Sequence, residues 1–172
     1  MAGQIVTFEQ CFARLLGHEG GFTLDRADRG NWTGGAVGKG DLKGTKYGVS
    51  AAAFPGEDIS NLTLDRAQHL YKIHYWGPAG CDALPDGVRF DVFDMAVNAG
   101  VKRAVRTLQM AVGATQDGIL GPRTLLAVQS MPAVRLMARF NGYRLEHLAG
   151  LPTWPSFGRG WCKRIAKNLQ EA

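Results

Sequence analysis

The feature that most constrains the fold of this chain is a concentration of glycine in its first third. Ten of the 23 glycines lie between Gly17 and Gly48, in a chain of 172 residues. Glycine weakens helix and strand interiors but supplies the positive φ angles that turns require. Residues 22–50 also lack a sustained apolar period, so we expect a long loop with one or two short strands around Phe22 and residues 47–49. A loop of this length in a small domain is usually functional.

The rest of the chain has the apolar spacing and the glycine and proline stops of helices. We expect about seven helices, at residues 7–20, 61–76, 90–100, 101–113, from 121, 130–150 and around 161–169. The predicted fold class is therefore all-α to α+β, with a glycine-rich active-site loop or small hairpin. A change of composition at residues 77–88 suggests two subdomains, 1–80 and 85–172, that form one compact unit.

Charge and cysteine content limit the classes of partner. The net charge is +5 with an isoelectric point near 9.3, which favours an anionic partner: nucleic acid, lipid or cell-wall polymer. No recognition helix or zinc pattern supports nucleic acid. Three cysteines without close spacing indicate neither a disulfide framework nor a metal site, and we expect no cofactor. The N-terminus has no visible secretory signal, and no stretch approaches the roughly 18 apolar residues of a membrane span.

Glu19 is the candidate catalytic residue. It lies eleven residues after Phe8, which at about 100° per residue places it on the apolar stripe of the first predicted helix. Burial and the negative end of a helix both favour the neutral form of a carboxyl group. An acid that stays protonated near neutral pH can act as a general acid. The alternative is a glutamate that faces solvent at a fraying helix end.

The motifs around Glu19 resemble a known family. Residues 19–22 (EGGF) precede residues 44–50 (GTKYGVS), and residues 94–100 and 117–124 follow. This order resembles the family 108 glycoside hydrolases, phage and bacterial muramidases with a Glu-Gly-Gly-Tyr/Phe signature, across residues 8–165. The resemblance implies a lysozyme-like fold in which Glu19 is the catalytic acid. It also implies that the C-terminal region is of a peptidoglycan-binding type, although residues 117–124 equally fit a plain corner between helices.

The resemblance also suggests partners for Glu19. Thr45 matches the threonine of the family motif, although the longer loop at residues 31–43 leaves Thr33 as an alternative. The order is similar to the Glu, Asp, Thr arrangement of phage T4-type lysozymes. Asp28 is the preferred second carboxylate and Asp25 the second choice; ordinary turn capping is the alternative for both. Whether the two carboxyls are spaced for inversion or for retention stays open.

Other side chains are candidates for binding sugar. Trp32 and Tyr47 offer flat apolar faces within the glycine-rich loop, and Ser50 follows in the motif. The amides of Asn98 and Gln109 could bond acetamido groups. A structural role is the alternative for each of these side chains, and Asn98 could simply cap a helix.

These features predict a monomeric muramidase. Glu19 would protonate the glycosidic oxygen between N-acetylmuramic acid and N-acetylglucosamine, and a water oriented by Asp28 and Thr45 would attack the anomeric carbon. A lytic transglycosylase and a non-catalytic wall-binding module are the alternatives. We expect synthesis in the host cytoplasm and release through a separate pore, as in phage lysis proteins of this family. Residues 157–167 (FGRGWCKRIAK) could lie on an anionic outer membrane or form a docked last helix.

Overall fold

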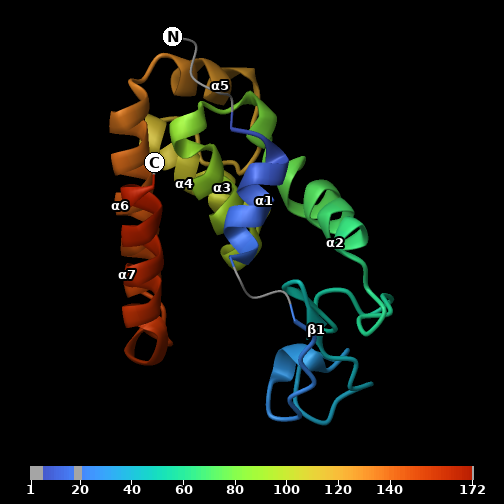
Figure 1. The fold of residues 1–172 in the computed structure, drawn as a ribbon. Helices are drawn as coiled ribbons and strands as arrows, with labels where there is room; N and C mark the ends of the chain where they lie inside the picture. The colour runs from blue at the N-terminus through green and yellow to red at the C-terminus, as the bar shows by residue number, and fades with distance from the viewer. Residues whose placement is uncertain (1–5, 18–20, 172) are drawn as a thin grey trace. The chain divides into compact units, whose positions relative to one another are not determined.

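The computed structural model describes residues 6–17 and 21–171 and is mostly helical (Figure 1). The described residues form seven α-helices and one small antiparallel hairpin, which confirms the expected fold class. The α-helices are α1 (Phe8–Leu16), α2 (Leu64–Tyr71), α3 (Asp86–Ala99), α4 (Val101–Val112), α5 (Pro122–Gln129), α6 (Ala133–Ala149) and α7 (Trp154–Gln170). Among the described residues, none of the helices combines the length and the hydropathy of a membrane span.

The chain divides into two units. One is Glu9–Lys72, and the other combines Met1–Phe8 with Ile73–Ala172. The glycine-rich loop and its candidate residues belong to the first unit, whereas Asn98 and Gln109 belong to the second. The roles that we expected for residues 1–80 and 85–172 stay predictions.

Helix α1 ends earlier than its sequence suggests. It begins after Thr7 and stops at Leu16, because Gly17 takes a left-handed conformation with φ +58°. The Gly17 N–H donates to the Ala13 carbonyl at 3.1 Å, closing the last turn. The helix expected over residues 7–20 is therefore given too late an end, because Gly17 already provides the helix cap.

The hairpin consists of β1 (Thr45–Lys46) and β2 (Val49–Ser50). Thr45 pairs with Ser50 and Lys46 pairs with Val49. Tyr47 and Gly48 form the connecting turn with φ values of +51° and +73°, and positive φ at both central positions is what a type I′ turn requires. The expected strand at 47–49 is thus displaced, because its first two residues make the turn.

The remainder of the loop is held by local hydrogen bonds. Its one helical turn is η1 (Arg29–Asn31). The strand expected near Phe22 is reduced to a single bridge between Thr23 and Thr45. Another bridge joins Trp32 to Leu42 and closes the longer part of the loop at residues 31–43, the inserted segment.

The core of the Glu9–Lys72 unit gathers apolar side chains from α1, the hairpin and α2. The rings of Phe12 and Tyr71 meet edge to face with centroids 5.2 Å apart, and Val49 is fully buried. The Thr63 hydroxyl caps α2 by accepting the Arg66 N–H at 3.2 Å. Helix α2 then passes into the π-helical segment η2 (Lys72–Trp76), within the helix expected over 61–76.

The second unit is built around α3. Every residue from Val88 to Ala96 is buried, as expected for a helix that is covered on all sides. Helices α4 and α6 make the most extensive contacts with α3, and α7 packs on α6. The helix η3 (Cys81–Ala83) precedes α3, and Trp76 and Phe93 meet edge to face at 5.3 Å.

Candidate functional site

Glu19 lies outside the described residues, with His18 and Gly20. The part of α1 that is described ends at Leu16, and Gly17 is left-handed. Helical periodicity would place Glu19 on the buried stripe only if α1 continued to position 19, and α1 ends at Leu16. The role of Glu19 stays a prediction that depends on the sequence motif.

Asn31 makes hydrogen bonds that join several parts of the loop, and the sequence analysis did not single it out. It is fully buried. Its side-chain Nδ2 donates to the Asp25 carbonyl at 3.0 Å, and its Oδ1 accepts the Thr45 hydroxyl at 2.6 Å. Its own carbonyl accepts the N–H groups of Lys43 and Gly44 at 2.9 and 3.1 Å. One side chain therefore joins the Asp25–Asp28 segment to β1.

Asp25 and Asp28 both cap turns. Asp25 Oδ1 accepts the Ala27 N–H at 2.9 Å, and Asp28 Oδ1 accepts the Gly30 N–H at 2.8 Å as the N-cap of η1. Both side chains are exposed. Among the described residues the second carboxylate oxygen of each has no hydrogen-bond partner, so capping leaves one acceptor open on either residue.

The two candidate threonines have different surroundings. Thr45 is half-buried in β1, and its hydroxyl belongs to the Asn31 hydrogen-bond cluster. The Thr33 hydroxyl instead accepts the Asp41 N–H at 2.8 Å, within the inserted segment. The structure therefore brings Thr45, but not Thr33, into one hydrogen-bond cluster with Asp25.

The aromatic candidates and Ser50 are held within the same unit. The Trp32 indole donates to the Arg26 carbonyl at 2.9 Å, which fixes a half-buried ring. Tyr47 is half-buried at the hairpin turn, and Lys46 Nζ lies 5.5 Å from its ring centroid. Ser50 Oγ accepts the Ala53 N–H at 3.3 Å, which agrees with a capping role.

A pocket of about 500 Å³ opens beside this loop. It combines exposed apolar side chains with charged ones, and is lined by Phe22, Leu24, Leu42, Lys43, Gly56, Glu57, Asp58, Ile59 and Ser60. The Asn61 side chain donates to Asp58 at 2.9 Å, which together with Ser60 lowers the pKa of Asp58. Apolar surface beside ionised acceptors is a surface that can bind a sugar ring and its hydroxyls.

Gln109 does not fit its expected role in ligand binding. Its side chain is fully buried, and its Nε2 donates to Asp117 Oδ1 at 2.6 Å and to the Ile119 carbonyl at 3.0 Å. Its Oε1 accepts the Gly118 N–H at 2.9 Å. The amide therefore uses its hydrogen-bonding groups to hold the turn before α5. The hydrogen bond from Gln109 to Asp117 also lowers the pKa of Asp117.

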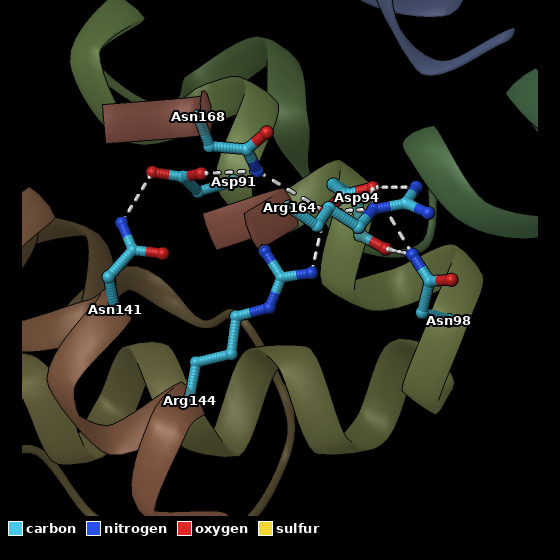
Figure 2. Close-up of polar contacts among 7 residues, drawn as sticks. All are labelled: Asp91, Asp94, Asn98, Asn141, Arg144, Arg164 and Asn168. Carbon is cyan, nitrogen blue, oxygen red and sulfur yellow. Dashed lines mark hydrogen bonds and ion pairs between the residues drawn. The ribbon is translucent and has the colours of Figure 1, made fainter. Parts of the chain in front are cut away.

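Asn98 is part of a buried ionic network that the sequence reasoning also missed (Figure 2). Asp94 is fully buried on α3; Arg144 Nη2 lies 2.5 Å from its Oδ2, and Arg164 contacts both carboxylate oxygens. Asn98 Nδ2 donates to the Asp94 carbonyl at 2.6 Å. Burial raises the pKa of Asp94, but the charges and hydrogen bonds of Arg144 and Arg164 outweigh it, so the pKa is lowered.

The pKa of a second carboxyl group in this network is shifted in the opposite direction. Asp91 accepts Asn141 Nδ2 at 2.7 Å and Asn168 Nδ2 at 3.0 Å, as Figure 2 shows. Burial raises its pKa, and these amide bonds only partly compensate. Across residues 6–17 and 21–171, no group of three or more His, Cys, Asp or Glu side chains is arranged to hold a metal ion.

Comparisons with known proteins identify the family. The family model described as glycosyl hydrolase 108 matches residues 12–100, which include Glu19, Asp25, Asp28 and Thr45. Twelve chains of solved structures match. One, described as the structure of Brucella abortus SagA, is 31% identical with a TM-score of 0.79, over 95% of this chain and 92% of that chain. No curated protein matches. A family model that spans over half of the chain, and a similar fold over nearly all of it, show that this chain belongs to glycosyl hydrolase family 108.

Proposed function

We propose that this chain is an N-acetylmuramidase, which cleaves the bond between N-acetylmuramic acid and N-acetylglucosamine in peptidoglycan. Membership of the family implies a glycosidase that degrades peptidoglycan in general. The observation that carries the finer proposal is the Asn31 cluster, which ties Thr45 to the Asp25–Asp28 segment within the loop that follows position 19. The positive net charge of the chain supports binding to an anionic wall.

In the proposed reaction Glu19 donates its proton to the departing glycosidic oxygen. A water molecule attacks the anomeric carbon and loses a proton to a carboxylate, for which Asp28 is the candidate. Because the Thr45 hydroxyl donates its proton to Asn31, the lone pairs of its oxygen can accept a hydrogen bond from that water. One oxygen of Asp28 is occupied by Gly30 N–H and the other can accept the water proton.

The decisive experiment replaces the proposed acid. Glu19→Gln removes the transferable proton with little change in size, and we expect release of reducing ends from purified peptidoglycan to fall at least about 100-fold. Glu146→Gln, at an exposed position of α6, is the matched control and should retain activity. Circular dichroism checks that both variants are folded. Cleavage by Glu19→Gln at the wild-type rate would remove Glu19 from the mechanism.

A lytic transglycosylase is the second candidate, because Asp25 and Asp28 both cap turns and that reaction requires only the acid. Its attacking group is the 6-hydroxyl of the muramic acid, so the products carry 1,6-anhydro ends and are lighter than hydrolysis products by one water. Mass spectrometry of the digest separates the two reactions. Anhydro ends as the main product would replace hydrolysis by transglycosylation, and the absence of any cleavage would favour a wall-binding module.

A further inference from the structure

A second pocket lies in the Ile73–Ala172 unit, apart from all residues assigned to catalysis. Its volume is about 380 Å³, within the range of sites that bind small molecules. Side chains of α3, α4, α6, α7 and the α6–α7 connection line it: Met95, Asn98, Ala99, Arg103, Arg144, His147, Leu148, Leu151, Trp161 and Arg164.

The polar part of this pocket is cationic. Three arginines and a histidine line it, and its lining residues include no Asp or Glu. Asp94 lies beneath the surface and pairs with Arg144 and Arg164 (Figure 2). The guanidinium group of Arg103, in contrast, has no hydrogen bond or ion pair with any residue in the described ranges, although the Arg103 carbonyl accepts the Thr107 hydroxyl at 3.0 Å. Burial lowers the pKa of His147, and the nearby positive charge of Arg103 lowers it further.

Arg144 adds an unsatisfied donor. Its side chain is 4% exposed, and Nη2 binds Asp94. Nη1 is buried and has no hydrogen-bond partner in the part of the chain that the structure describes. Burying a guanidinium nitrogen without a hydrogen-bond partner costs free energy. A bound anion, or a water molecule that the anion holds, would supply the missing acceptor.

The remaining part of the pocket lining is mostly apolar. Leu148, Leu151, Met95 and Ala99 supply apolar side chains to the lining, beside the cationic groups. Trp161 completes this part; its ring is held by Trp154 and Phe157, with centroids 6.1 and 5.9 Å away. A small inorganic anion would leave the apolar part uncovered, whereas a purely apolar ligand would remove water from the guanidinium groups without replacing its hydrogen bonds.

We propose that this pocket binds an anionic amphiphile: one carboxylate or phosphate group, bound by Arg103 and Arg164, joined to an apolar body that packs on Trp161, Leu148 and Leu151. Guanidinium groups bind either anion in a bidentate manner. The proposal is independent of the glycosidase function, because none of these residues belongs to the proposed catalytic machinery.

Calorimetry with the full chain and four probes tests both halves of the ligand. Octanoate and octyl phosphate carry an anion and an apolar chain, 1-octanol lacks the anion, and acetate lacks the chain. We expect at least one of the two anionic amphiphiles to bind at least tenfold more tightly than octanol and acetate. The stronger of the two identifies the headgroup as carboxylate or phosphate. Failure of both to bind at millimolar concentration, or equal binding of octanol, would overturn the proposal.

Two arginine variants locate the site. Arg103→Gln should weaken binding of the preferred amphiphile at least tenfold, because it removes the guanidinium group that has no partner among residues 6–17 and 21–171. Arg135→Gln, at an exposed position of α6 outside the pocket, changes the net charge equally and should bind as the wild type does. Both should cleave peptidoglycan normally. Equal binding by Arg103→Gln and the wild type would contradict the assignment, whatever the activity of Glu19→Gln.

Discussion

The hydroxyl of Thr45 donates a hydrogen bond of 2.6 Å to Oδ1 of Asn31, fourteen residues earlier in the chain. The bond fixes the rotation of the hydroxyl, because its proton is committed to a fully buried amide. Asn31 is itself held by the Asp25 carbonyl. The geometry of the proposed water site therefore depends on a residue that does not contact the water.

Thr45→Val should test this arrangement directly. Valine keeps the shape but removes the oxygen, so we expect peptidoglycan hydrolysis to fall at least about tenfold, whereas Thr45→Ser should retain most of it. Thr33→Val removes the hydroxyl that binds Asp41 N–H and should affect stability more than rate. Initial rates with matched amounts of folded protein are the measurement. The reverse pattern, with Thr33→Val inactive and Thr45→Val active, would transfer the role to Thr33.

The turn of the hairpin gives a stability prediction. Gly48 has φ +73°, and a Cβ added there would lie 2.4 Å from the Tyr71 hydroxyl. Gly48→Ala should therefore lower the free energy of unfolding by at least about 1–2 kcal/mol, the usual cost of a left-handed L-residue. Gly56→Ala is the control, since its Cβ would meet open space without a positive φ. Urea unfolding curves compare the two, and equal midpoints would contradict the conformational argument.

Local sequence signals predicted the helix ends more accurately than they predicted the contacts within the loop. Gly100 and Gly113 were expected to end helices, and both have positive φ at those boundaries. The pair Gly20-Gly21 is a stronger local stop signal than the single Gly17, although the earlier glycine closes α1. These features depend on neighbours within one turn of the helix.

The contacts of Asn31 and Asp94 could not be predicted in the same way. The partners of Asn31 include Thr45, 14 residues away, and those of Asp94 include Arg144 and Arg164, 50 and 70 residues away. No period or spacing in the sequence reports such pairs. Asp94 lies in a helix whose central nine residues are all buried, and a carboxylate within an apolar helix was the available signal for a buried ion pair.

Gln109 gives a prediction that separates structure from binding. Gln109→Leu leaves Asp117 and the Gly118 N–H without their amide partner, and we expect a loss of about 1–3 kcal/mol in the free energy of unfolding. Binding of the folded protein to purified peptidoglycan should not change, because the amide is buried. Thermal unfolding and a sedimentation assay measure the two quantities. A variant of normal stability that no longer binds peptidoglycan would restore the acetamido-binding role.

The Asp94 network predicts how stability depends on pH. Asp94→Asn leaves Arg144 buried without its counter-ion, and we expect a loss of about 3–5 kcal/mol near neutral pH. The lowered pKa of Asp94 means that its ionised form stabilises the folded state. That contribution is complete above the ordinary pKa of 3.8 and is lost as the pH falls through the lower pKa of the folded state. The difference in the free energy of unfolding between wild type and Asp94→Asn should therefore disappear only in strong acid.

Asp91 affects the pH dependence of stability in the opposite direction, so its contribution must be separated from that of Asp94. Because burial raises its pKa, its ionisation lowers the stability of the folded protein as the pH rises from the ordinary value to the folded one. Asp91 is present in wild type and in Asp94→Asn, so subtracting the two unfolding free energies at each pH removes most of its contribution. Asp65→Asn, an exposed change on α2, should give a difference near zero throughout. If the gap for Asp94→Asn instead widened below pH 3.8, the neutral form of Asp94 would be the stabilising one.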